Sequence, residues 1–130
     1  MKPVSSEYFH GTDGDSILQI MSSGLLKPGK SGRIFLGRYS WESCMMHGPD
    51  RKRRASFVIK IRIGEIASAT TIFRETHGVR DAVEIQTDRP IPAEVLALYV
   101  RRLADDGPAS LDRVEGSIAI KQFLGPPLDG

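Results

Sequence analysis

A His-Gly-Thr tripeptide near the start of the chain is the first group of residues that could hold a small molecule. His10 and Thr12 supply a ring nitrogen and a hydroxyl, both able to form hydrogen bonds, and Gly11 lies between them. Because glycine has no Cβ, a flat ligand group can lie close to the main chain at Gly11. The alternative is that His10 ends a buried strand and Gly11 only turns the chain. For the tripeptide alone we favour this alternative.

A carboxylate in the second half of the chain is the next candidate. Glu84 alternates with Val83 and Ile85, which is the period-two pattern of a β-strand. The Glu84 side chain is therefore expected on the face opposite Val83 and Ile85, where it could face either a polar cleft or solvent. Asp81 precedes the same strand and has the simpler interpretation of a turn residue.

Four consecutive cations, Arg51, Lys52, Arg53 and Arg54, precede the most regular strand pattern of the chain. We expect them in an exposed loop beside the sheet, where adjacent positive charges repel each other unless an anion or solvent screens them. Such a run is either a solvated surface or a contact for phosphate, and a nucleic acid bound there would dissociate steeply with salt.

Composition indicates a single soluble globular domain over residues 1–130. The chain is 40% hydrophobic and 26% charged, with a net charge of +2. No apolar run approaches the length of a membrane span, and residues 1–6 lack the apolar core of a secretory signal. Cys44 is the only cysteine, and three histidines are scattered through the sequence, so we expect no disulfide, no metal site and a reducing, cytosol-like compartment.

Periodicity and turn residues predict an α+β fold. We expect Asp13 or Asp15 to cap a helix that ends at Gly24, and Ser40 to cap a second helix that ends at His47. The strand 57–63 is predicted to be half-buried, and residues 89–92 to break the strand before them. The remaining expectations are strands over 7–10, 34–36, 71–73, 83–87 and 95–100, a polar loop over 103–116 and a last strand over 118–123.

Three stretches, taken in order, resemble the ADP-ribosyltransferase superfamily, the NAD-binding fold of poly-ADP-ribose polymerases, bacterial toxins and RNA 2′-phosphotransferases. The first is Tyr8 to Thr12 followed by Gly24-Leu25, the second is Gly32 to Leu36 followed by Ser40 and Ser43, and the third is Val83 to Pro92. The resemblance implies split β-sheets that form an NAD cleft, with short flanking helices. Its motifs lie within residues 7–102, and residues 103–130 would be a C-terminal extension that completes the fold.

The resemblance also implies roles for the residues of the first two motifs. His10 would bond the adenosine ribose, the Gly11 backbone would hold the nicotinamide amide, and Thr12 would line the same site. Phe35 stands where many members have a tyrosine that stacks on nicotinamide, so the aromatic face is kept and a hydroxyl is lost. Tyr39 is the alternative aromatic residue, beside Ser40 of the same motif.

The third motif would supply the catalytic carboxylate. Alignment with the DNA-modifying toxins selects Glu84, and alignment with the polymerases selects Asp81; we favour Glu84 because the longer acid is the commoner choice in the family. Such an enzyme cleaves the nicotinamide–ribose bond of NAD without a metal and transfers ADP-ribose to a protein or nucleic acid. A compact toxin or effector of this kind implies action in the cytoplasm, an antitoxin or immunity partner and no membrane association.

Two other functions remain open at this stage. An RNA 2′-phosphotransferase would use Arg51 to Arg54 to grip a phosphate, although Phe35 stands where that branch usually has histidine and Glu84 where it usually has an apolar aromatic residue. A non-catalytic module that binds NAD or RNA on the same fold is the second.

Overall fold

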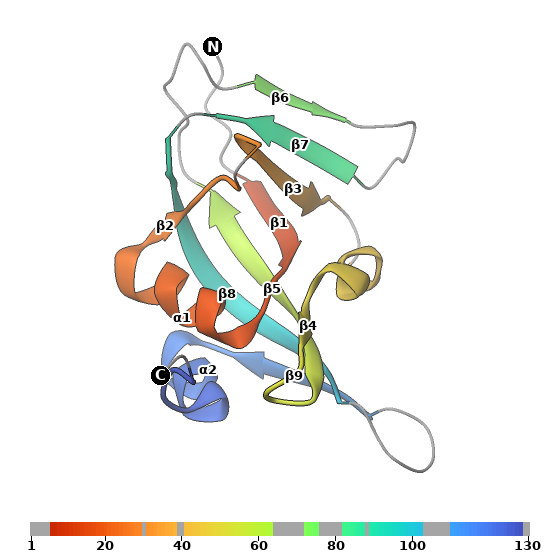
Figure 1. The fold of residues 1–130 in the computed structure, drawn as a ribbon, viewed down its shortest axis with the longest axis vertical. Helices are drawn as coiled ribbons and strands as arrows, with labels where there is room; N and C mark the ends of the chain where they lie inside the picture. Colours follow the sequence, from red (N-terminus) through yellow and green to blue (C-terminus); the bar gives the residue numbers. More distant parts are fainter. Residues whose placement is uncertain are drawn as a thin grey trace.

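An antiparallel sheet with two short α-helices forms the part of the chain that the structure describes (Figure 1). The structure is a computed structural model, and it describes residues 6–29, 31–38, 41–63, 72–75, 82–87, 89–102 and 110–128. The predicted α+β class is confirmed. None of the helices in these ranges is long and apolar enough to cross a membrane.

The sheet has two parts that meet at the junction of β1 and β3. Its order is β2-β8-β5-β1-β3-β7-β6, with β4 added beside β5 and β9 beside β8, and every pairing within the described ranges is antiparallel. The strands are β1 (Ser6–Gly11), β2 (Leu25–Leu26), β3 (Arg33–Gly37), β4 (Pro49–Asp50), β5 (Ala55–Ile63), β6 (Ile72–Glu75), β7 (Ala82–Gln86), β8 (Ile91–Arg102) and β9 (Ser110–Glu115). β1 pairs with β5 from Ser6 to Gly11 but with β3 only where Phe9 faces Gly37.

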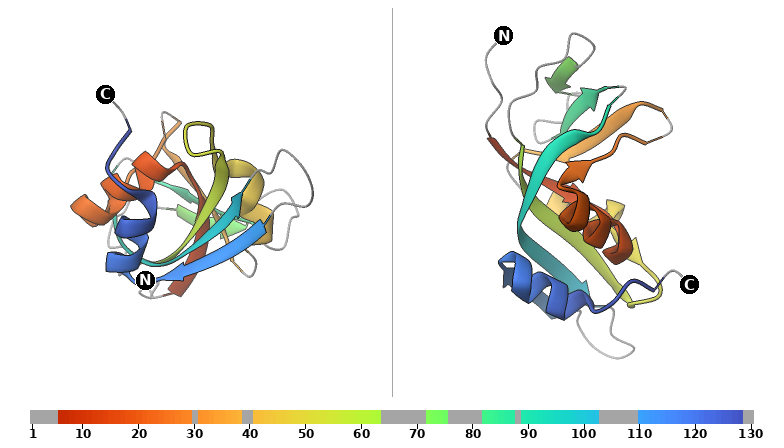
Figure 2. Two further views of the ribbon diagram at one scale, coloured as in Figure 1. Left: turned by 90° about the horizontal axis from the view of Figure 1, so that it is seen from below. Right: turned by 90° about the vertical axis from the view of Figure 1, so that its left-hand side faces the viewer.

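The central strand β5 alternates as predicted: one face is buried at every second position from Ala55 to Ile63, whereas the other carries the partly exposed Lys60 and the exposed Arg62. Phe57, Ile59 and Ile61 contribute to a large core that also contains side chains of α1 (Gly14–Ser23) and α2 (Ser117–Leu124). Both helices lie on this face of the sheet (Figure 2). On the opposite face Val58 packs into a smaller cluster with Tyr99 of β8. Because that cluster is assembled from distant segments, local alternation could not reveal it.

Helix α1 follows the predicted local signals. The Asp13 side chain caps it by accepting a hydrogen bond from the Ser16 N–H at 2.8 Å. Gly24 ends it in the left-handed conformation, with a φ of 71°, as glycine does readily. Ile17 and Ile20 of α1 are buried in the core, so this short helix is held mainly by its apolar face.

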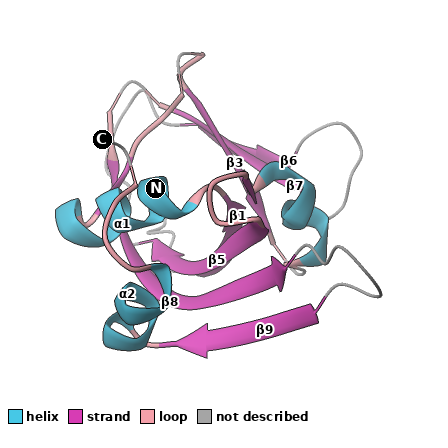
Figure 3. Ribbon diagram, turned by 60° about the horizontal axis from the view of Figure 1, so that its bottom comes forward, coloured by secondary structure: helices cyan, strands magenta, loops and turns pink. Residues whose placement is uncertain are grey.

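The C-terminal part differs from the prediction. Residues 110–115, expected to be loop, form the edge strand β9 beside β8, and residues 117–124, expected to include a strand, form α2 (Figure 3). β9 has no fully buried residue, and its sequence lacks the alternation of apolar and polar residues by which a strand is recognised. In α2 the buried residues are Ile120 and Leu124, four apart, which is helical spacing.

Two further boundaries are corrected. The second predicted helix is the 3₁₀ helix η1 (Glu42–His47), whose N-cap position is Trp41; the expected cap, Ser40, lies outside the described residues. The strand β7 ends at Gln86, one residue before the predicted end. Pro92, expected in the break after this strand, belongs to the next strand, β8, where it faces Leu25 of the two-residue strand β2.

Candidate functional site

His10 lies at the junction of β1 and β3. We call this junction, together with the residue of β7 that is paired with Phe35, the seam. The His10 Nδ1 lies 2.9 Å from the backbone carbonyl oxygen of Phe35. A carbonyl oxygen can only accept, so Nδ1–H is the donor and Nε2 of the neutral ring remains an acceptor. Burial lowers the pKa of His10 below its usual value of 6.5, the bond to Phe35 opposes this shift, and the charge of His47 adds to it. The ring is therefore neutral at pH 7.

The register of β3 and β7 places Phe35 opposite Glu84. In β3 the side chains of Ile34 and Leu36 are buried, whereas the Phe35 side chain is 50% exposed. Phe35 thus has a histidine on one neighbouring strand and, at the paired position of the other, a glutamate. His10, Phe35 and Glu84 are far apart in the sequence, and the sheet brings their backbones together.

Packing requires the absence of a side chain at Gly11, a role that was not among the two expected, a ligand's approach or a turn of the chain. A Cβ at Gly11 would collide with the Cys44 carbonyl oxygen and would lie 3.1 Å from the Gly48 nitrogen, so the backbone of η1 occupies the space. The N–H of the next residue, Thr12, donates to Phe57 of β5 at 3.3 Å. The backbone N–H and C=O groups of successive strand residues point to opposite sides of the strand. Because the Thr12 N–H points toward β5, the Gly11 N–H and C=O are directed away from β5, on the side of β3.

A cavity of about 150 Å³ lies beside His10 and Thr12, against one face of α1. Its lining is rich in groups that form hydrogen bonds and includes the positively charged Lys27. The residues that line it are His10, Thr12, Ser16, Gln19, Ile20, Ser23, Leu25, Leu26 and Lys27. The polar residues of α1 that line this cavity were not predicted as site residues from the sequence, although their spacing of three and four residues marks one helical face.

The basic run forms the turn between β4 and β5. Arg51, Lys52 and Arg54 are exposed as expected, but the Arg53 side chain is only 11% exposed, which corrects the expectation of four equivalent surface charges. Its guanidinium forms ion pairs of 2.9 Å with Asp15 and of 2.9 Å with Asp50. Arg53 therefore joins the start of α1 to the turn.

Backbone groups complete the network around Arg53. Its guanidinium also donates to the carbonyl oxygens of Leu124 at 3.3 Å and Pro126 at 3.4 Å. Burial raises the pKa of Asp50, but hydrogen bonds from the Gly14 N–H and from Arg53 outweigh burial and hold that pKa below its usual value. A Cβ at Gly14 would lie 2.7 Å from the Arg53 guanidinium, so the absence of a side chain there admits the arginine.

The remaining predicted site residues, Tyr39, Ser40 and Asp81, lie outside the described residues. Within the described ranges no group of three or more His, Cys, Asp or Glu side chains is arranged to hold a metal ion. The geometry thus offers a neutral histidine, an exposed aromatic ring and a carboxylate-bearing position along one seam, and a separate basic turn.

Comparison of the chain with family models, with characterised proteins and with solved structures finds no match.

Proposed function

We propose that this protein is an NAD-dependent ADP-ribosyltransferase that cleaves the nicotinamide–ribose bond and transfers ADP-ribose to a protein or nucleic acid. The observation that supports it is the seam, where His10, Phe35 and Glu84, one from each of the three motifs, occupy neighbouring positions on three strands. The proposal also includes an ADP-ribosyltransferase-like fold, in which the two parts of the sheet on either side of the seam form the NAD cleft.

His10 acts in this proposal as a hydrogen-bond acceptor. Its Nδ1–H is held by the Phe35 carbonyl, which leaves Nε2 to accept from a ribose hydroxyl. The lowered pKa keeps the ring neutral at pH 7, and a neutral ring is needed because a protonated Nε2 could not accept.

Phe35 and Gly11 hold the nicotinamide. The exposed Phe35 ring provides an apolar face for stacking, and an offset stack of aromatic rings contributes about 1 kcal/mol beyond the buried area. The Gly11 N–H and C=O, which are directed away from β5, pair with the carboxamide of the same ring.

Glu84 stabilises the reacting sugar. When the bond from the ribose to nicotinamide breaks, the bonding electrons leave with nicotinamide and positive charge develops on the ribose, as in glycoside cleavage. A carboxylate at the paired position of β7 stabilises that charge and accepts the proton of the attacking hydroxyl or amine. The products are nicotinamide and the ADP-ribosylated acceptor.

Incubation with NAD labelled in its adenylate part tests the proposal. The protein is mixed with separate protein, DNA and RNA fractions, and both nicotinamide release and label transfer are measured. We expect nicotinamide release together with transfer to one of the fractions. If neither occurs with any fraction, the proposed reaction is wrong.

Two added measurements separate the alternatives. A 2′-phosphorylated RNA in the same assay would lose its phosphate only to a phosphotransferase. Calorimetry with NAD that shows binding without turnover would indicate a non-catalytic module on the same fold.

A further inference from the structure

The cavity beside His10 and Thr12, which we call the helix cavity, is too small for a whole dinucleotide. Its volume is about 150 Å³, whereas small-molecule sites usually measure about 300–1,000 Å³. The helix cavity therefore suits one group of a ligand. Because His10 lines it, that group is a neighbour of the ribose hydroxyl that His10 bonds in the proposed function.

The charge of the helix cavity comes from Lys27. Among the described residues that line the cavity, Lys27 is the one permanent cation, and none is a carboxylate. In the dinucleotide-binding α/β fold, a carboxylate bonds the adenosine ribose hydroxyl of NAD, and a cation at a similar place accommodates the 2′-phosphate of NADP. The helix cavity thus has the charge that suits the phosphorylated ribose.

Unused polar side chains surround Lys27. The Lys27 side chain is exposed and forms no ion pair or hydrogen bond with any residue that the structure describes. Ser16 and Gln19, three residues apart on α1, line the same cavity, and in the described ranges their side chains have no hydrogen-bond partner either. A hydroxyl and an amide N–H can both donate to phosphate oxygens.

The carboxylates in the neighbourhood are already held by other groups. They line a cavity of about 330 Å³ at the start of α1, which shares residues of this helix with the helix cavity. Asp13 accepts from the Ser16 N–H at 2.8 Å, and Asp15 and Asp50 each pair with Arg53 at 2.9 Å. The lysine of the helix cavity is therefore left for a ligand.

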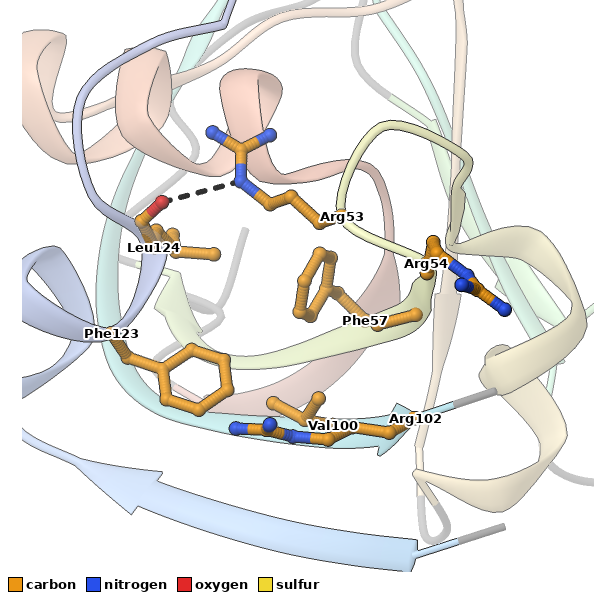
Figure 4. A pocket seen from close by; sticks show the side chains of 8 residues that line it. Arg53, Arg54, Phe57, Val100, Arg102, Phe123 and Leu124 are labelled. Atoms are coloured by element: carbon orange, nitrogen blue, oxygen red, sulfur yellow. Dashed lines mark hydrogen bonds between the residues drawn. The ribbon is translucent and has the colours of Figure 1, made fainter. Parts of the chain in front are cut away.

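The larger pocket between the β4–β5 turn, β8 and α2, of about 450 Å³, suits an anion less well because its arginines are engaged (Figure 4). Arg53 donates to the Leu124 carbonyl oxygen at 3.3 Å besides its two ion pairs. Arg102 contacts Asp112 at 3.3 Å and lies 5.2 Å from the centre of the Phe123 ring. An anion would have to compete with these partners, whereas in the helix cavity it meets an unpaired lysine.

We propose that the helix cavity binds the 2′-phosphate of NADP, which makes NADP a substrate of the proposed reaction; the inference rests on that reaction. His10 Nε2 accepts from the 3′-hydroxyl of the adenosine ribose, and Lys27 pairs with the phosphate on the adjacent carbon. Ser16 and Gln19 donate to the remaining phosphate oxygens. A phosphate monoester carries about 1.5–2 negative charges at pH 7, and Lys27 neutralises one of them.

Calorimetric titration of the full chain with NADP and with NAD tests the proposal, because the two dinucleotides differ only in the 2′-phosphate. The decisive variant is Lys27→Gln. Its matched control is Lys121→Gln, which removes the same charge from an exposed residue of α2 that does not line the helix cavity. Lys27→Glu is added because a carboxylate there repels the phosphate and can bond a ribose hydroxyl instead.

We expect the parent to bind NADP at least as tightly as NAD. Lys27→Gln should weaken NADP binding about tenfold or more and change NAD binding less than about twofold, and Lys121→Gln should change neither. Lys27→Glu should weaken NADP binding further and keep NAD binding.

Two results would overturn the inference alone: binding of NAD without binding of NADP, or equal losses for both dinucleotides in Lys27→Gln, which would place Lys27 at the diphosphate that they share. Binding of neither dinucleotide would instead contradict the proposed function itself, and the inference with it.

Discussion

Replacing Arg53 by Gln should destabilise the protein far more than the same change at Arg51, although both residues belong to one basic run. Gln cannot pair with Asp15 and Asp50, whose side chains are 14% and 5% exposed. Removing one partner of a buried ion pair costs about 3–5 kcal/mol, because the remaining charge is left without compensation. Arg51 is exposed, and its replacement should stay within about 0.5 kcal/mol.

The structure favours the lower end of that range. Asp50 keeps the Gly14 N–H at 2.8 Å and the Arg53 backbone N–H at 3.0 Å in the variant, so its charge is not left without donors. We therefore expect a loss of about 3 kcal/mol, which for a domain of this size lowers the melting temperature by about 10 °C. Urea unfolding followed by circular dichroism measures the free energy of both variants.

The pH dependence of the Arg53 effect provides an independent check. The pKa of Asp50 is lower in the folded protein than its usual value of 3.8, so its contribution to stability is present above pH 3.8 and is lost as the pH falls through the folded pKa. The difference between parent and Arg53→Gln should therefore narrow at acidic pH. A loss below about 0.5 kcal/mol at pH 7, equal to that of Arg51→Gln, would refute the reasoning.

Three further predictions follow from the seam. Gly11→Ala should lower the free energy of unfolding by about 2 kcal/mol or more, because the new Cβ collides with the backbone of η1. Gly29→Ala, whose Cβ would lie 3.8 Å from its nearest neighbour, should change this free energy little, and urea unfolding of both variants measures the difference. Because the pKa of His10 is lowered, NAD affinity should stay constant down to pH 6.5 and fall only at lower pH. The free energy of unfolding should already decline below pH 6.5, because the unfolded state binds the proton more readily than the folded state. Calorimetry at several pH values and an NMR titration of the imidazole check both, and an imidazole midpoint at or above pH 6.5 contradicts the assignment. Phe35→Ala should weaken NAD binding about fivefold with little change in stability, since the ring is half exposed, and Met46→Ala, at an exposed residue of η1, should change neither; equal NAD affinity for parent and Phe35→Ala would exclude stacking.

Elements with strong local signals could be predicted from the sequence. The Asp13 cap, the Gly24 stop and the alternation in β5 each depend on residues close in the chain, and the structure confirms all three elements. The predictions for the residues of β9 and α2 were wrong for opposite reasons. β9 is an exposed edge strand with no buried residue to mark its period, whereas the run of apolar residues in α2 fits a short strand as well as a helix.

Contacts between distant residues could not be predicted. The role of Arg53 depends on Asp15 at the start of α1 and on carbonyl groups of the C-terminal segment, and no local pattern joins these positions. The register that pairs Phe35 with Glu84 is likewise a property of the assembled sheet. Gly11 illustrates a third case, because the sequence left a ligand's approach and a turn as its two roles, whereas in the structure the backbone of η1 lies against it.

The most direct test of the proposed reaction compares nicotinamide release by the parent, Glu84→Gln and Glu94→Gln. Glu94 is an exposed glutamate of β8 whose carboxylate contacts Arg62 at 3.1 Å, so its replacement makes the same chemical change away from the seam. We predict that Glu84→Gln releases nicotinamide about a hundredfold more slowly with NAD affinity nearly unchanged, and that Glu94→Gln matches the parent. Release by Glu84→Gln at the parental rate would contradict the assignment of the carboxylate and with it the proposed mechanism.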